Sequence, residues 1–265
     1  MGMANVDRGA LVALLYQMAD DELIVGHRDC EWLGLAPHLE EDVAFSSIAQ
    51  DEVGHAVNLY QLLQDLGEGR VDDLAYGRPP ERYLNAVLLE RPNGKGTYMD
   101  NPQFDWAYTV VRRLVYDVFD GVRLAVAAQS AYTPLADLAA RMRREERYHL
   151  LHHVTWFKRL ATGTEESRSR ILNAVEKVWP DLPGLFVLGE AGPGAHFPAS
   201  SADLLSQFEA ELKPLFQEVG IPWREISLNQ EIAENGRLGI HSPDLRTLLT
   251  TMGEVRFQEP EAVAW

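Results

Sequence analysis

The sequence has few cysteines, few basic residues and no long apolar run. Only one of its 265 residues, Cys30, is a cysteine, which excludes an internal disulfide and a cysteine-based zinc site. No apolar run reaches the roughly 18–20 residues that span a bilayer. The first residues also lack the basic and apolar regions of a signal peptide. These absences predict a cytoplasmic protein with no membrane partner.

Basic side chains are scarce relative to acids: 24 Lys and Arg stand against 40 Asp and Glu, for a formal net charge of −16. Nucleic-acid binding needs clustered basic residues, so we expect no nucleic-acid partner. Hydrophobic residues make up 46% of the chain, enough to bury a sizeable core. Most of the acids are expected to lie on the surface, and the informative question is which of them face inward.

Clear strand alternation is also absent, and Gly and Pro separate long segments of helical periodicity. Two long helices, an irregular crossover over residues 67–104 and two more long helices are predicted, which is the connectivity of a ferritin-like four-helix bundle. The fold class is therefore all-α: a ferritin-like four-helix bundle with additional C-terminal helices. The predicted bundle helices cover residues 7–27, 37–66, 102–130 and 133–163, and the later helices cover 167–179, 202–219 and 242–257.

The chain is expected to form a single ferritin-like domain over residues 1–265. Its core bundle would occupy about 7–163 and a C-terminal helical extension about 164–265. Residues 180–200 are expected to form a loop, and the tail 258–265 is expected to be extended.

Each long helix carries an acid inside its apolar stripe, at spacings of three and four that place it on the buried face. None of these stripes contains Lys or Arg. An unpaired buried carboxylate costs roughly several kcal/mol unless a cation neutralises it, and two iron ions, or manganese, would neutralise four. Bundles achieve this with one Glu from each of two helices and Glu-x-x-His from the other two. The predicted metal ligands are Glu22, Glu52, His55, Asp117, Glu146 and His149, with an Asp replacing one Glu.

The intervals between these residues support a dinuclear site. Glu22 precedes Glu52 by 30 residues, and Asp117 precedes Glu146 by 29. Each interval fits one helix up, a short turn and one helix back, so each hairpin would place its lone carboxylate level with its Glu-x-x-His. The sequence predicts two similar halves around one centre.

Several neighbouring residues have alternative roles. Asp120 competes with Asp117, but its own stripe holds Arg113, Tyr116 and Arg123, which indicates a solvated or ion-paired face. Asp117 is therefore the preferred ligand on this helix.

Asp51 and Glu145 each precede a predicted ligand, and they either hydrogen-bond to a ligand histidine across the bundle or are solvated. His153 continues the fourth stripe, where a satisfied core histidine is favoured over a third nitrogen ligand. Cys30 lies outside the stripes and is a weak candidate for a nucleophile. The other histidines lack metal-ligand spacing and are expected to be surface or packing residues: His27, His38, His152, His196 and His241.

Four stretches carry a resemblance to a known family: ADDELIVGHRDCEWLGLAPHLEEDVAFSSIAQDEVGHAVNLYQLL, LLERPNGKG, RREERYHLLHHVTWFKRLATGT and GIHSPDLRTLLTTMGEV. Over nearly its whole length the chain resembles the subunits of the bacterial phenylacetyl-CoA epoxidase, a multicomponent di-iron monooxygenase, and most closely the C-type subunit. The resemblance implies a homo- or hetero-oligomer, with a homologous oxygenase subunit and a reductase as partners. It also implies an aryl-CoA substrate in phenylacetate degradation.

In this family the A-type subunit carries the working di-iron centre, whereas C-type chains often have the ligands replaced. Here QDEVGH (Glu52, His55) and EERYH (Glu146, His149) match the A-type metal pattern. If the site works, the resemblance implies that two irons, reduced by the reductase, use dioxygen to oxidise the aromatic ring of the CoA thioester.

Three functions remain open: a metal-bearing oxygenase subunit, a structural partner of a catalytic relative, and a ferritin-like iron-binding protein. The long C-terminal extension argues against the third. A set of basic residues would meet CoA phosphates, meet an acidic partner or balance surface charge, the last being preferred: Arg91, Lys95, Arg112, Arg113, Arg141, Arg143 and Arg144.

Overall fold

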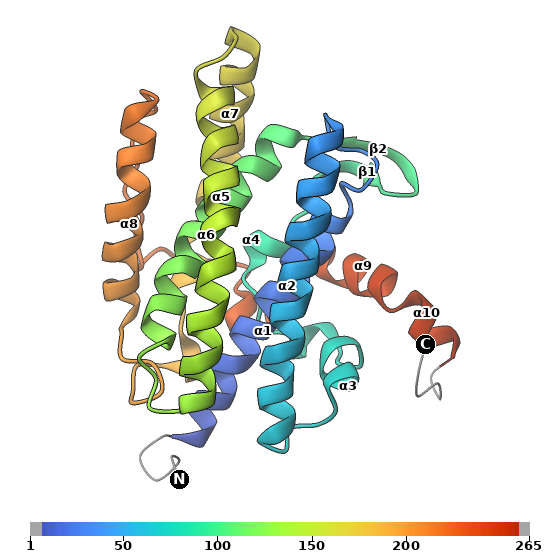
Figure 1. The fold of residues 1–265 in the computed structure, drawn as a ribbon, viewed down its shortest axis with the longest axis vertical. Coiled ribbons are helices and arrows are strands. Elements are labelled where there is room, and N and C mark those ends of the chain that lie inside the picture. Colours follow the sequence, from blue (N-terminus) through green and yellow to red (C-terminus); the bar gives the residue numbers. More distant parts are fainter. Residues whose placement is uncertain (1–6, 260–265) are drawn as a thin grey trace.

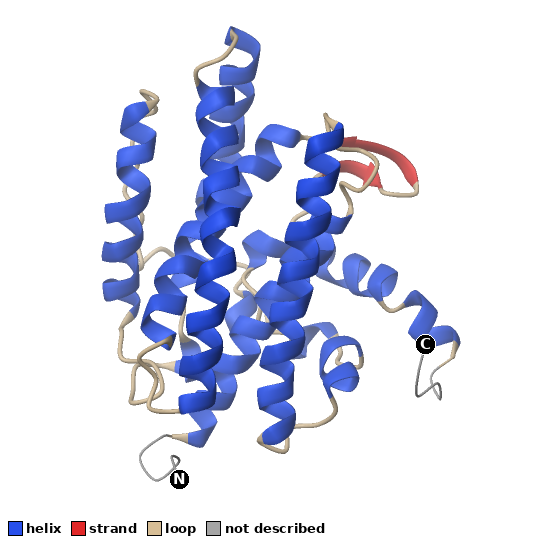
Figure 2. Cartoon of the chain, in the orientation of Figure 1, coloured by secondary structure: helices blue, strands red, loops and turns tan. Residues whose placement is uncertain are grey.

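The computed structural model describes residues 7–259 of the chain, so the predicted extended tail lies almost wholly outside the described residues. Helices dominate this range, with one small two-stranded sheet (Figure 2). No helix within it combines the length and the apolarity needed to cross a membrane.

Four long helices form the bundle. Helix α1 packs against α2 and α5 against α6 as two helical hairpins, and α2 also contacts α6 across the bundle (Figure 1). This arrangement confirms the all-α, ferritin-like fold. The helices are α1 (Arg8–Cys30), α2 (Leu39–Asp65), α5 (Trp106–Ala127) and α6 (Thr133–Ala161).

The crossover between α2 and α5 is more regular than predicted. The expectation of no strands is wrong at one exposed hairpin, where Gly94 pairs with Phe104 and Lys95 with Gln103 in antiparallel register. The hairpin is short and buries no face, so no alternation of apolar and polar residues marks it in the sequence. The crossover contains α3 (Val71–Tyr76), a 3₁₀ turn (Pro80–Arg82), α4 (Val87–Glu90), β1 (Gly94–Thr97) and β2 (Asp100–Phe104).

The third bundle helix begins later than predicted. Pro102 lies in β2, and α5 starts at Trp106. Asn101, which precedes Pro102, has a left-handed backbone with a φ of 46°, so the chain is not helical here. The helix is then capped by Asp105, whose Oδ1 accepts a hydrogen bond from the Tyr108 amide at 3.3 Å.

The C-terminal extension adds helices to the flank of the bundle, where α7 and α8 pack against α5 (Figure 1). The predicted last helix is broken at Gly253, and the predicted loop over 180–200 contains two 3₁₀ turns. The elements are α7 (Glu165–Val178), α8 (Ser201–Glu218), α9 (Pro243–Met252), α10 (Glu254–Gln258) and 3₁₀ turns at Trp179–Phe186, Gly189–Ala191 and Gly236–Leu238.

Because the extension covers its outer side, α5 is buried on nearly every face. Phe216 of α8 anchors the cover: it is fully buried, with its ring centroid 5.2 Å from that of Phe157 and 5.7 Å from that of Trp179. The buried arginines of α5 pair inside the protein with acids of α1 and α2.

Candidate metal centre

Four acidic and histidine side chains from three helices meet in the bundle core. Glu22 of α1, Glu52 and His55 of α2 and Glu146 of α6 are all buried, and each offers one ligand atom within 4.8 Å of the others. All four are predicted ligands, and the regular helical rise brings them to one level.

The ligand atoms of this group make no hydrogen bonds to other described residues. Within the described residues, Glu22 Oε2, Glu52 Oε2, His55 Nδ1 and both Glu146 carboxylate oxygens are buried without a hydrogen-bond partner. Leaving several such atoms unpaired in one place is costly. The group therefore fits a divalent cation with mixed nitrogen and oxygen ligands.

His149 lies beside this group. Its Nδ1 is 3.2 Å from Glu146 Oε1 and 3.4 Å from Glu52 Oε1, and it has no hydrogen-bond partner within the described residues. The same Glu146 oxygen lies 3.4 Å from His55 Nδ1, so it stands between the two imidazoles.

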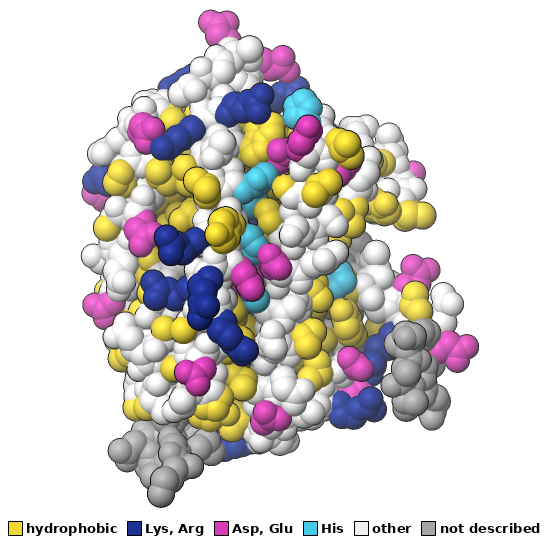
Figure 3. All heavy atoms as spheres, viewed as in Figure 1, with side chains coloured by type: hydrophobic (Ala, Val, Ile, Leu, Met, Phe, Trp, Pro, Cys, Tyr) yellow, Lys and Arg dark blue, Asp and Glu magenta, His cyan; other side chains and the backbone are white. Residues whose placement is uncertain are grey.

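Two partly exposed carboxylates form hydrogen bonds with the Nε2 atoms of His55 and His149. Glu145 Oε2 of α6 lies 2.6 Å from His55 Nε2, and Asp51 Oδ2 of α2 lies 3.2 Å from His149 Nε2. Each bond crosses from one helix to the other, and each leaves Nδ1 directed inward. The Glu145 and Asp51 side chains are 55% and 40% exposed, and Figure 3 shows histidines bordered by acids along the seam between α2 and α6.

Asp117 lies apart from the group of four. Its Oδ2 is 2.6 Å from His153 Nδ1, and its Oδ1 is 3.0 Å from Arg113 Nη2. Burial is the main cause that raises the pKa of Asp117 to about 7, with Arg113 opposing it. His153 is fully buried and serves as the partner of this carboxylate.

Asp120 is equally buried and bonds to Arg123, whose guanidinium lies 2.5 Å from Asp120 Oδ1 and 3.2 Å from Glu22 Oε1. Tyr116 donates a hydrogen bond to the same Glu22 oxygen at 2.9 Å. The face of α5 that carries these residues is thus ion-paired and buried, and the alternative of a solvated face is wrong.

The expectation that no basic residue neutralises the core acids is also wrong. Arg113 has no exposed surface, and its Nη2 lies 2.5 Å from Glu52 Oε1, while Arg123 is 3% exposed. Both lie outside the predicted apolar stripe but on the side of α5 that faces the bundle, where Arg113 meets Asp29 and Glu52 and Arg123 meets Asp21 and Glu22.

Two of the seven basic residues assigned to surface charge are likewise misplaced. Arg112 and Arg113 are fully buried, and Arg112 donates to the Arg91 carbonyl and to Asn93 Oδ1, both at 2.6 Å. Arg91 is partly buried and pairs with Asp181 at 2.9 Å. The sequence held one signal for the burial of Arg113: Arg113, Asp117 and Asp120 follow one another at spacings of four and three, on one side of α5.

The pKa values of several groups in the centre lie far from their ordinary values. Burial opposes protonation of His55 and His149, but the neighbouring carboxylates, Glu146 foremost, raise the pKa of these imidazoles to about 12 and about 11. Burial raises the pKa of Glu22 well above its ordinary range. In the absence of metal the centre therefore holds protons on its histidines, and metal binding would release them.

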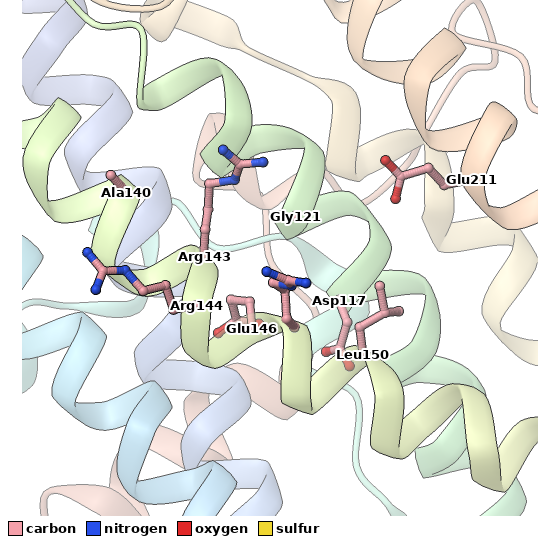
Figure 4. A pocket seen from close by; sticks show the side chains of 9 residues that line it. Asp117, Gly121, Ala140, Arg143, Arg144, Glu146, Leu150 and Glu211 are labelled. Carbon is pink, nitrogen blue, oxygen red and sulfur yellow. The ribbon is translucent and has the colours of Figure 1, made fainter.

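A cavity of about 340 Å³ reaches the centre from the side of α5, α6 and α8 (Figure 4). Asp117 and Glu146 line its inner part, and Gly121 leaves it open, because a Cβ atom there would have no heavy atom within 4 Å. Three arginines of α6 also line it: Arg143, Arg144 and Arg147.

The whole chain, residues 1–265, matches one protein family, the phenylacetic acid catabolic proteins. The chain belongs to this family. It is similar to the C-type subunit of the 1,2-phenylacetyl-CoA epoxidase of Escherichia coli K12, with 29% identity over 246 residues, which cover 91% of this chain and 94% of that relative. It is also similar to the A-type subunit of the same enzyme, with 23% identity over 187 residues, or 71% of this chain and 56% of that relative.

Because the resemblance to this family implies a pair of irons, the residues of the centre can be compared with what two ions would need. The open atoms of Glu22, Glu52, His55 and Glu146 fit one ion. Asp117, the other predicted carboxylate ligand, has Oδ2 hydrogen-bonded to His153 and Oδ1 3.0 Å from the Arg113 guanidinium. The described residues thus bring four of the six predicted ligands together, and the Arg113 guanidinium lies beside Glu52 and Asp117.

Proposed function

We propose that this chain is a subunit of a bacterial monooxygenase complex of the phenylacetyl-CoA epoxidase type and that its bundle core binds a redox-active metal. The proposal is carried by the buried group of Glu22, Glu52, His55 and Glu146, whose ligand atoms are open, in a chain of this family. A transition metal bound there supplies redox chemistry with dioxygen. The complex would epoxidise the aromatic ring of an aryl-CoA thioester and would require a homologous oxygenase subunit and a reductase.

The chain's own residues would prepare this site in two ways. Glu145 and Asp51 orient the two imidazoles by hydrogen bonds to Nε2. Arg123 and Tyr116 both bond to Glu22 Oε1, which fixes that carboxylate and leaves Oε2 free.

Access to the site would be through the cavity between α5, α6 and α8. Three arginines line it together with Asp117, Glu146 and Glu211, and these arginines would pair with an anionic group of a reactant. Its volume of about 340 Å³ has room for an aromatic ring.

A second candidate function is that of a partner subunit that supports a catalytic relative without performing the chemistry. The buried ion pairs of Arg113 with Glu52 and of Arg123 with Glu22 favour it, because they neutralise acids that a working pair of metal ions would use. The similarity to the C-type relative over 91% of the chain is compatible with both candidates.

Co-expression with the A-type subunit and the reductase of the same organism separates these candidates. We expect the chain to co-purify with the A-type subunit and the assembled complex to convert phenylacetyl-CoA. Glu52→Gln in this chain is then compared with the equivalent substitution in the A-type subunit. Loss of turnover with the first variant supports a catalytic centre here, and loss with only the second supports the partner role. Failure to form any complex would refute the assignment to such an assembly.

A further inference from the structure

The guanidinium of Arg113 is a cation that is already present in this centre. Arg113 extends from α5, one turn before Asp117, and its Nη2 lies 2.5 Å from Glu52 Oε1 and 3.0 Å from Asp117 Oδ1. These two oxygens belong to the half of the centre that contains His149. The Arg113 side chain has no exposed surface, so its charge is available only to its buried neighbours.

Arg113 is already paired with three buried acids, because its Nη1 also lies 3.3 Å from Asp29 Oδ2. The other oxygen of Asp117 lies 2.6 Å from His153 Nδ1. His149 Nδ1 is directed at Glu52 Oε1, 3.4 Å away, the same oxygen that Arg113 binds. An ion placed between His149 and Asp117 would compete with the guanidinium for both carboxylates and would be repelled by its charge.

On the His55 side of the centre, by contrast, carboxylate oxygens remain without a partner among the described residues. Arg123 and Tyr116 bond only to Oε1 of Glu22, and Oε2 remains open, 3.6 Å from His55 Nδ1. Glu52 shows the same division, since Oε1 is bound by Arg113 and Oε2 is buried without a partner. The open atoms of both residues point to one position, which Glu146 also faces.

We propose that Arg113 is the resident cation of the His149 half and that this chain therefore binds a single divalent transition-metal ion, through Glu22, Glu52, His55 and Glu146. This inference rests on the metal-binding part of the proposed function and is independent of complex formation. A centre with one metal ion and one guanidinium suits the partner subunit better than a catalytic subunit that needs two metal ions.

Metal counting on the full-length chain tests this inference, with Mn²⁺ as the probe. The protein is stripped with a chelator, equilibrated with Mn²⁺, separated from free ion and assayed by elemental analysis and electron paramagnetic resonance. We expect one ion per chain, with the hyperfine-split signal of an isolated Mn²⁺. Two ions per chain with an exchange-coupled signal would overturn the inference, and so would the absence of bound metal.

Two variants test the role of Arg113 itself. Removing the guanidinium in Arg113→Gln should open the second position and raise the content from one ion to two. Arg112→Gln is the matched control, because Arg112 is the neighbouring residue, equally buried, and bonds to Asn93 and a backbone carbonyl rather than to the centre. This control should stay at one ion. An Arg113→Gln protein that folds but stays at one ion would refute the proposed role.

Asp117→Asn gives an answer even if Arg113→Gln does not fold. Because Asp117 lies outside the group of four and neighbours His153 and Arg113, this variant should keep the single ion, whereas Glu22→Gln should lose it. Loss of the ion in Asp117→Asn would show that Asp117 is a ligand and that the inference is wrong. Co-purification with the A-type subunit is measured separately, so a failure here does not count against the assignment to a complex.

Discussion

At the scale of single residues, Glu145 and Asp51 orient the imidazoles of His55 and His149 so that each Nδ1 atom faces the centre. Glu145 accepts from His55 Nε2 at 2.6 Å, which keeps the imidazole in the tautomer that offers Nδ1 to a metal. Partners of this kind typically contribute 10–100-fold to metal affinity. We expect Glu145→Gln to weaken Mn²⁺ binding by about 10-fold, measured by isothermal titration calorimetry.

The control for this prediction is another surface carboxylate of the bundle. Glu40 on α2 is exposed and contacts neither histidine, so Glu40→Gln should leave the affinity unchanged. Equal affinities in the Glu145 and Glu40 variants would show that the hydrogen bond to His55 does not support metal binding.

His27 provides a pH-dependent contribution to stability outside the centre. Burial lowers the pKa of His27 to about 4 from an ordinary value of 6.5. The unfolded chain therefore binds more protons between these values, so the contribution is fully present above about pH 6.5 and is lost as the pH falls toward 4. The loss amounts to about 3 kcal/mol.

Replacing His27 by Phe isolates this effect, because a ring is kept beside Tyr76, whose ring centroid is 6.1 Å away. The fall in unfolding free energy between pH 7 and pH 4.5, measured by urea titration, should be smaller in His27→Phe than in the parent. Parallel pH profiles for the two proteins would contradict the assignment.

At the scale of elements, the position of the acids was predictable and their partners were not. The 30-residue interval from Glu22 to Glu52 places both at one level because helical rise is constant and the turn is short. The pairing of Arg113 with Glu52 joins α5 to α2, and Arg113 also meets Asp29 of α1. Helical periodicity within α5 contains no information about which side chains of other helices lie opposite it.

The cover over α5 depends on α8, and Phe216 is its main anchor. Its ring is fully buried among Phe157, Trp179 and Trp223. Phe216→Ala should lower the free energy of unfolding by about 3–5 kcal/mol, as is typical of a deleted core aromatic. Gln217→Ala, at the adjacent exposed position, should change it by less than about 0.5 kcal/mol. Similar values for both would mean that α8 is not a structural part of the core.

At the scale of the whole molecule, the C-terminal extension is tied to the bundle by a buried charge. Arg237, 1% exposed, lies 2.7 Å from Asp21, which is next to Glu22 and also bonds to Arg123. We therefore expect bundle and extension to unfold in one transition, as a single domain would, with coincident changes in far-ultraviolet circular dichroism and tryptophan fluorescence. Two separated transitions would contradict the predicted single domain.

The buried acids also link the stability of the whole chain to metal. A ligand that binds only the folded state stabilises it by about 2.7 kcal/mol at a free concentration 100 times Kd. For a chain of this size that corresponds to a rise in Tm of roughly 5–10 °C. Adding Mn²⁺ to chelator-treated protein should produce this rise in a calorimetric scan, and removing it again with chelator should reverse it.

Glu146→Gln is the variant that makes this prediction specific. It keeps the shape of the side chain but removes the carboxylate whose two oxygens are both open toward the centre. Its Tm should be insensitive to Mn²⁺, because the remaining ligands cannot offset the loss of a charged oxygen donor. A Tm that rises equally in the parent and in Glu146→Gln would place the bound ion elsewhere on this acidic protein, and would leave the core acids to be neutralised by Arg113, Arg123 and the protonated histidines alone.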